Sequence, residues 1–295
     1  MQVIWVGVIL SATMAAVTMA SSKALPNCND SCGDVTIPYP YGMTEGCYLD
    51  DSKISGYYFI NCTTTNADDL PQPKIGNINV SSISTEEGEI EVRMFNSLDC
   101  YDKSGVLQKK KNQSLALSTF TLSASKNKFV AVGCDTFAYL NGELDGQNFS
   151  VGCLSRCLNI SIVADGRCSG IGCCEVSIPK GMKNIDFESY SFKNNHTKIW
   201  DFNPCSYAFI VREDEFKFSS DYLTSLEYYR AFPLVLDWAI GTDKCEVAQN
   251  KANYQCGENT ACSNPENQLG YRCKCKDGYE GNPYLGCQGI YSIYL

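Results

Sequence analysis

Short stretches of alternating polar and apolar residues, separated by turn sequences, run along most of this chain. Residues 89–94 (EIEVRM) alternate strictly, which is typical of a strand with one exposed face. Turn pairs such as Asn141-Gly142 separate the runs, whereas helical periodicity is confined to residues 219–229 and 245–253. The pattern therefore predicts a mainly β fold. The other predicted strands cover residues 56–62, 119–122, 128–134, 159–163 and 206–211.

The N-terminus departs from this pattern because it is almost continuously apolar from Val3 to Leu10. Small residues such as Ala16 and Ala20 follow, where signal peptidase would cleave. We predict a signal peptide over residues 1–24, in preference to a short buried helix. No later stretch reaches the roughly 20 apolar residues that a membrane-spanning helix needs, so the mature chain is expected to be soluble and extracellular.

Eighteen cysteines follow the leader. In a secreted chain, this many cysteines indicate a framework of disulfides rather than a set of metal ligands. Two spacings imitate zinc sites, namely Cys153 with Cys157 and the adjacent pair Cys173-Cys174. Vicinal cysteines rarely bridge each other because the ring would be strained. Each is therefore expected to pair elsewhere, and no metal site is predicted.

Seven Asn-x-Ser/Thr sequons support secretion and predict a glycoprotein. One of them lies beside Cys62, where the asparagine can be buried and unused. The acceptor residues are Asn29, Asn61, Asn79, Asn112, Asn148, Asn159 and Asn195.

A polar break at residues 109–114 (KKKNQS) suggests how the chain is divided. We predict a cysteine-rich domain over residues 25–110, a second segment over 111–244, a compact module over 245–288 and an atypical tail over 289–295. The first two segments hold five and seven cysteines. Because both numbers are odd, either one disulfide joins the segments or the boundary is misplaced.

Charge and composition narrow the classes of function. The formal net charge is −9, and nucleic acid is not expected as a partner because phosphate binding needs a basic surface. The only histidine, His196, lies inside the sequon of Asn195, where a glycan would crowd it. A Ser-His-Asp or Cys-His catalytic pair is therefore disfavoured. Nothing marks the carboxylate pair of a glycosidase, so the chain is predicted not to be an enzyme.

Several motifs resemble one family when they are taken in order. Residues 28–42 (CNDSCGDVTIPYPYG) resemble the opening of the galacturonan-binding domain of plant wall-associated receptor kinases. Residues 166–174 (GRCSGIGCC) and 203–209 (NPCSYAF) are similar to the second ectodomain segment of that family, as is LDWAI at 236–240. The resemblance covers residues 28–288. It implies an extracellular domain that binds pectin in the cell wall and acts in cell-wall sensing.

The last six cysteines have the spacing of an epidermal-growth-factor-like (EGF-like) module, and GYEGNPYL at 278–285 is similar to the EGF-like repeat of the same family. This resemblance implies first–third, second–fourth and fifth–sixth pairing. Calcium-binding members of the family have acidic residues just before the first cysteine, and Asp243-Lys244 lacks that full pattern, so no bound calcium is expected. The predicted fold is thus a mainly β, disulfide-rich, multi-module extracellular protein that ends in an EGF-like module. The implied disulfides are Cys245–Cys262, Cys256–Cys273 and Cys275–Cys287.

The end of the chain departs from the family pattern. Family members usually continue into a second repeat, a transmembrane helix and a kinase, whereas the tail after Gln288 resembles none of these. It fits a truncated gene model, a read-through exon or a secreted short form. Kinase activity is therefore not carried over, and a plasma-membrane location is expected only for a longer form.

Galacturonan is a polyanion, so an acidic chain needs a local basic patch or bridging calcium to bind it. No other cofactor is predicted. Tyrosines near the start of the first domain could stack on sugar rings, although a core position is favoured for each. The alternative function is a protein-interaction ectodomain that docks receptor kinases at the cell surface or binds a secreted peptide. The candidate ligand-binding residues are Lys53, Lys74, Arg93, Lys103, Lys109, Lys110, Lys111, Tyr39 and Tyr41.

Overall fold

A computed structural model describes most of the chain. The signal-peptide prediction (almost all of it), the candidate residue Lys53 and the end of the tail lie outside the described residues. The described ranges are 23–50, 57–64, 69–117, 119–192, 194–226, 231–266 and 269–290.

The prediction of a mainly β, disulfide-rich fold is confirmed, and its first large component is an antiparallel six-stranded sheet. Its strand order is β10-β17-β6-β5-β4-β3. The strict alternation at residues 89–94 forms β6, which buries Ile90, Val92 and Met94 on one face. The strands are β3 (Asn61–Thr63), β4 (Gln72–Ile75), β5 (Ile78–Ser84), β6 (Glu89–Met94), β10 (Thr121–Leu122) and β17 (Phe232–Asp237).

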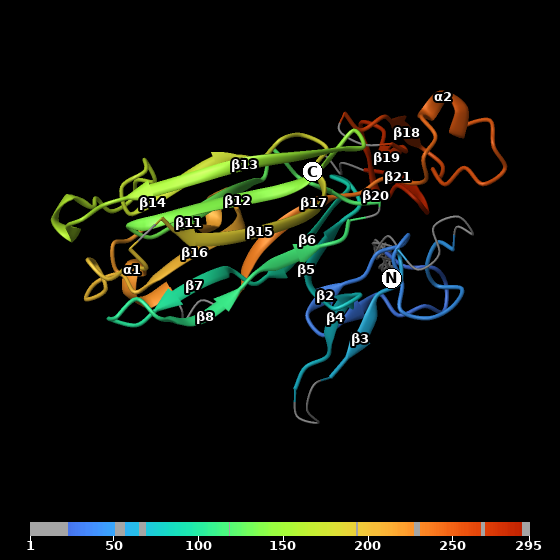
Figure 1. Ribbon diagram of the computed structural model, residues 1–295. Helices are drawn as coiled ribbons and strands as arrows, with labels where there is room; N and C mark the ends of the chain where they lie inside the picture. Colours follow the sequence, from blue (N-terminus) through green and yellow to red (C-terminus); the bar gives the residue numbers. More distant parts are fainter. Residues whose placement is uncertain are drawn as a thin grey trace, which may run out of the picture.

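A β-sandwich of two further sheets makes up the body of the molecule (Figure 1). Phe129 of one sheet packs against Phe187 of the other, with ring centroids 6.0 Å apart. The five-stranded sheet has the order β14-β11-β16-β7-β8, with β7 (Ser97–Tyr101), β8 (Leu107–Lys111), β11 (Asn127–Val132), β14 (Cys173–Ser177) and β16 (Cys205–Arg212). The four-stranded sheet has the order β13-β12-β15-β9, with β9 (Gln113–Leu115), β12 (Asp135–Leu144), β13 (Gln147–Arg156) and β15 (Lys183–Ser191).

Helices are short, and one predicted strand is wrong. Residues 159–163 contain a 3-10 helix over Ile160–Ile162 instead of a strand. The Asn159 side chain accepts a hydrogen bond from the backbone nitrogen of Ser161, which turns the chain locally. The other helical elements are the 3-10 helix Glu213–Glu215, α1 (Tyr222–Ser225) and α2 (Cys245–Ala248). None of the helices in the described ranges is long and apolar enough to cross a membrane.

Three small hairpins complete the fold, one near the N-terminus and two in the C-terminal module. They pair β1 (Ser31–Cys32) with β2 (Val35–Thr36), β18 (Thr260–Ser263) with β19 (Arg272–Cys275), and β20 (Tyr279–Asn282) with β21 (Gly286–Gly289).

The six-stranded sheet draws strands from both sides of the predicted break at residues 109–114. Strands β10 and β17 come from the second predicted segment, yet β17 pairs along the whole of β6. The break itself is occupied by β8 and β9. Cys100 is bonded to Cys205, and this disulfide joins the two segments with odd cysteine counts.

Every cysteine in the described residues is in a disulfide. The C-terminal module has the three pairs that the family resemblance implied. Cys173 and Cys174 each pair with a different partner, as expected for vicinal cysteines. The remaining disulfides are Cys28–Cys47, Cys32–Cys62, Cys134–Cys157, Cys153–Cys174 and Cys168–Cys173.

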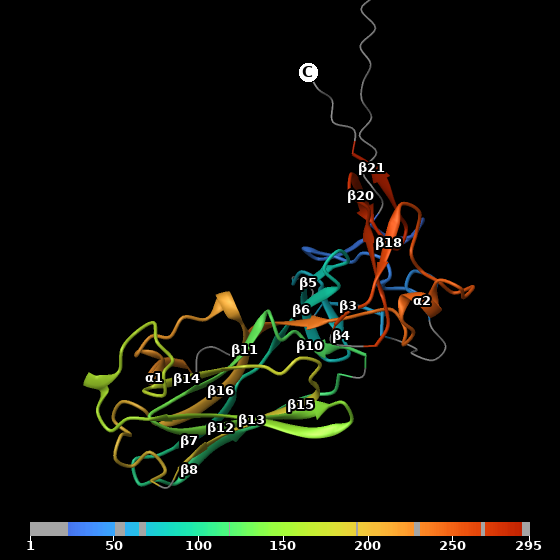
Figure 2. The same ribbon diagram turned by 90° about the horizontal axis from the view of Figure 1, so that it is seen from above.

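The N-terminal segment and the C-terminal module lie side by side at one end of the sandwich (Figures 1 and 2). A buried aromatic cluster unites all three predicted domains there. The indole of Trp238 lies 5.3 Å from the ring of Tyr41 and 5.5 Å from that of Tyr284. The Asn282 amide also donates to the carbonyls of Lys23 and Tyr39. The C-terminal module is therefore docked onto the rest of the protein.

Candidate functional site

Two of the predicted basic residues lie in one row across the six-stranded sheet. Lys74 on β4 is opposite Asn79 on β5, and Asn79 is in turn opposite Arg93 on β6. Asn61 on β3 continues the row beyond Lys74. Asn61, Asn79 and Arg93 are exposed and Lys74 is half-buried. Because neighbouring strands are about 4.8 Å apart, the two basic residues are separated by roughly 10 Å. We call these four residues the basic row.

A second basic segment approaches this row from the neighbouring sheet. Phe95 follows Arg93 by two residues and is exposed, as Arg93 is. The ammonium group of Lys111, at the end of β8, lies 4.3 Å from the centroid of the Phe95 ring. The basic row is thus extended from β6 towards β8 by a cation–π contact.

The other candidate lysines are divided between different surroundings. Lys109 and Lys110 are both exposed on β8, and their side chains point to opposite faces of the strand. The Lys110 ammonium lies 4.2 Å from the ring centroid of Tyr190. Lys103 belongs to neither group, since it pairs with Asp201 at 3.1 Å in an exposed ion pair. Of the candidate bases, the structure therefore associates Lys74, Arg93 and Lys111 most closely.

Carboxylates on the same face of β6 are paired with bases of the sandwich. Glu91 forms a salt bridge with Arg212, and Glu89 lies 3.9 Å from the Lys126 ammonium. Burial raises the pKa of Glu89, while Lys126 opposes this effect. These pairs line a cavity of about 640 Å³ beside the row. A smaller cavity of about 200 Å³ includes Asn79 and Arg93 in its lining.

The charge balance around the row argues against simple attraction of a polyanion. Residues 28–94 contain eleven Asp or Glu residues but only three Lys or Arg. Long-range steering by this region would therefore disfavour an anionic ligand. An anionic ligand would therefore need local contacts with the row, or a cation that bridges its carboxylates to those of the protein.

The predicted tyrosines are not part of the row. Tyr41 has no exposed surface and packs between Tyr58 and Trp238, so its side chain is inaccessible to a ligand. Burial raises its pKa well above the usual value. Tyr39 is also buried and donates a hydrogen bond to Gln255. Both belong to the packing that joins the domains, which is the interpretation that the sequence favoured.

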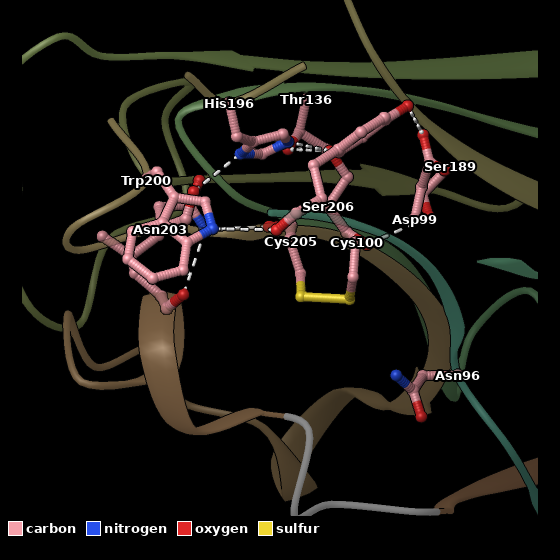
Figure 3. The surroundings of a disulfide bond; sticks show 12 residues. Asn96, Asp99, Cys100, Thr136, Ser189, His196, Trp200, Asn203, Cys205 and Ser206 are labelled. Atoms are coloured by element: carbon pink, nitrogen blue, oxygen red, sulfur yellow. Dashed lines mark hydrogen bonds between the residues drawn. A yellow bond between two sulfur atoms is a disulfide. The ribbon is translucent and has the colours of Figure 1, made fainter. Parts of the chain in front are cut away.

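His196 is buried in a closed polar network inside the sandwich (Figure 3). Its Nδ1 donates to the carbonyl of Asn203 at 2.8 Å, and its Nε2 lies 2.9 Å from the Ser206 hydroxyl. That hydroxyl is also 2.8 Å from the hydroxyl of Thr136. Burial lowers the pKa of His196, which keeps the ring neutral. Both ring nitrogens are occupied, so the histidine is structural.

Metal ligation has no candidate within the residues that the structure describes. No group of three or more His, Cys, Asp or Glu side chains is arranged there to hold a metal ion.

Comparison with known proteins identifies the region that contains the row. Residues 28–94 match the family described as "Wall-associated receptor kinase galacturonan-binding". Wall-associated receptor kinase 1 of Arabidopsis thaliana is 37% identical over 268 residues, which cover 90% of this chain and 34% of the relative. Over most of its length this chain is similar to the wall-associated receptor kinases, and residues 28–94 match their galacturonan-binding domain. Wall-associated receptor kinase 2 of the same plant is 35% identical over 280 residues, covering 94% and 36%.

The family resemblance inferred from the motifs is thus confirmed. The chain spans about a third of the length of these curated relatives, and no solved structure matches it. Lys74 and Arg93 lie inside the galacturonan-binding domain at 28–94, whereas Lys103 and Lys109 to Lys111 follow it. Sequence analysis missed Phe95. The alternation of residues 93–95 was the available signal, because it places Phe95 on the same exposed face as Arg93, with the buried Met94 between them.

Proposed function

We propose that this chain is an extracellular, non-catalytic protein of the plant cell wall that binds de-esterified galacturonan through the basic row. The observation that carries the proposal is the placement of Lys74 and Arg93 on one exposed face inside the galacturonan-binding domain. Lys111 beside Phe95 extends that face and supplies a third cation. On the same face of β6, Glu89 and Glu91 are paired with Lys126 and Arg212 rather than with Arg93.

The contacts suit a chain of uronic acids in three ways. The Arg93 guanidinium can make paired hydrogen bonds to a carboxylate, whereas a lysine ammonium acts as a point charge. The exposed Asn79 amide between them can donate to, and accept from, sugar hydroxyls. The spacing of the two bases across the sheet would engage carboxylates on different sugar units rather than a single one.

Calcium enters the proposal as part of the ligand. Because the galacturonan-binding domain is strongly acidic, bridging calcium would offset the repulsion between protein and polysaccharide carboxylates. Two components are therefore expected, one carried by Lys74 and Arg93 and a second that needs calcium. Cell-wall sensing would follow if such a domain is linked to a receptor, as the names of the relatives suggest.

The test compares ligands that differ only in charge. The secreted protein is assayed by biolayer interferometry against de-esterified oligogalacturonides, fully methyl-esterified ones and neutral glucans, each with and without calcium. We expect binding to the de-esterified ligand alone. It should weaken as salt is added, because exposed charges are screened over about 8 Å at physiological ionic strength.

The basic segment on β8 is tested separately. Replacing Lys109, Lys110 and Lys111 with Glu should weaken binding if the site extends along that strand. If de-esterified oligogalacturonides bind no better than neutral glucans at low salt, with or without calcium, the pectin proposal is wrong. Docking of a protein partner, such as a receptor kinase or a secreted peptide, would then replace it.

A further inference from the structure

The basic row contains two of the seven glycosylation sequons. Asn61 and Asn79 are both acceptor residues, and they flank Lys74 in the register of β3, β4 and β5. Asn79 is also the direct neighbour of Arg93 across β5 and β6. Each acceptor therefore lies about one strand spacing, roughly 4.8 Å, from a base that the proposed function requires.

The Asn79 side chain is available for modification. It is exposed, and among the described residues its amide makes no hydrogen bond. Asn195 differs, because its side-chain nitrogen donates to the carbonyl of Gly105 at 3.0 Å. The sequon in the centre of the row is thus better presented than that of Asn195.

A glycan at Asn79 would occupy the space that a polysaccharide must enter. N-linked glycans are bulky and project from the surface, whereas the distance from Asn79 to either base is a single strand spacing. The glycan adds no positive charge that would compensate for the lost contacts. Its effect on an approaching chain of galacturonic acid would be steric exclusion from Lys74 and Arg93.

We propose that N-glycosylation of Asn79, supported by Asn61, caps the galacturonan-binding face, so that the affinity for galacturonan depends on the glycoform. This inference rests on the proposed function, because it uses the same row of residues. If the capped face is open for less than a third of the time, the apparent affinity falls about threefold or more. Glycan occupancy at one sequon would then regulate how much of the secreted protein binds pectin.

The experiment removes the same glycan in two ways. Asn79→Gln deletes the acceptor, whereas Ser81→Ala deletes the sequon and keeps Asn79 in the row. Asn148→Gln, on β13 of the four-stranded sheet, is the control that removes a glycan elsewhere. Glycopeptide mass spectrometry measures occupancy, and biolayer interferometry measures the dissociation constant for de-esterified oligogalacturonides.

We expect both Asn79→Gln and Ser81→Ala to bind about threefold more tightly or better than the parent, with Asn148→Gln unchanged. Unchanged affinity in both variants would overturn the cap, and so would an empty Asn79 in the secreted parent protein. Either result leaves galacturonan binding itself intact. If no glycoform binds galacturonan, including the Asn61→Gln/Asn79→Gln double variant with calcium present, the proposed function fails instead.

Discussion

Arg272 of β19 connects the C-terminal module to both other parts of the chain. Its removal should lower the free energy of unfolding. Its Nε donates to the Trp238 carbonyl at 2.8 Å and its Nη1 to the Glu87 carbonyl at 2.9 Å. Its Nη2 lies 3.7 Å from the Asp237 carboxylate. The Arg272 and Asp237 side chains are only 16% and 12% exposed. Arg272→Ala therefore removes two hydrogen bonds and leaves the buried Asp237 carboxylate without its cationic partner.

The expected loss of stability comes from the buried Asp237 carboxylate, which no longer has its cationic partner. Burial already raises the pKa of Asp237, and the Arg272 guanidinium is the main opposing influence. Removing one partner of a fully buried pair costs about 3–5 kcal/mol. Because this pair keeps some contact with solvent, we expect a loss of about 2–3 kcal/mol in the free energy of unfolding at pH 7.

The loss should also depend on pH. In Arg272→Ala the folded-state pKa of Asp237 is raised further above its unfolded value. The native state then binds more protons than the unfolded state at pH values between the two, so stability falls as pH rises through that window. The deficit relative to the parent should therefore be larger at pH 7 than at pH 4.

The assay is urea unfolding of the secreted protein at both pH values, with Lys180→Ala as the control. Lys180 pairs with Glu266 of the same module at 3.2 Å, but these side chains are 67% and 81% exposed. An exposed pair contributes about 0–1 kcal/mol. Equal losses in the two variants, or an Arg272→Ala deficit that does not change with pH, would refute the reasoning.

Two further predictions concern the sandwich. Replacing Cys100 and Cys205 with Ser opens a loop of 105 residues, whereas replacing Cys168 and Cys173 opens one of 5. Chain entropy then predicts that the first pair costs about 2–3 kcal/mol more in urea unfolding, and equal costs would contradict this. Burial lowers the pKa of His196. Parent stability should thus fall below about pH 6.5, and His196→Gln should show a flatter pH dependence. If the free energy of unfolding of His196→Gln changes with pH between 7 and 5 as steeply as that of the parent, His196 is not the source of the pH dependence.

Local patterns predicted β6, β11 and β16 and parts of β3 and β10. They did not predict the long hairpin of β12 and β13, and the expected turn at Asn141-Gly142 is wrong because these residues lie inside β12. The alternation at residues 89–94 forms β6. The largely apolar runs at 128–134 and 206–211 overlap β11 and β16, which are buried on both faces because they pack between two clusters of the core. The failure at residues 159–163 arose from a side-chain cap, which competes with strand hydrogen bonds.

Strand β17 was not predicted, because its pattern depends on distant partners. Pro233 weakens the strand signal in the sequence, since proline cannot donate to a ladder. In the structure Pro233 pairs with Arg93 of β6, while β10 reaches only as far as Leu236 and Asp237. Pro233 thus occupies an edge position within the sheet. Sequence spacing could not reveal this arrangement, in which the partner strands lie more than a hundred residues apart.

The candidate site could be predicted as a set of residues but not as an arrangement. Lys74 and Arg93 were both candidates, yet their common row depends on the register of three strands. Lys110 and Lys111 are adjacent in sequence but contact different rings, Tyr190 and Phe95. The alternation of side chains in β8 separates them.

The most direct test of the central claim is the affinity of a charge-reversed basic row for galacturonan. Lys74→Glu/Arg93→Glu is compared with Lys274→Glu/Lys276→Glu, which makes the same change in net charge on exposed residues of the C-terminal module. Isothermal titration calorimetry with de-esterified oligogalacturonides gives each dissociation constant. The row variant should bind about tenfold more weakly or worse, equivalent to ~1.4 kcal/mol, while the module variant stays close to the parent. Equal weakening in the two variants, or full affinity in the row variant, would contradict the proposed site.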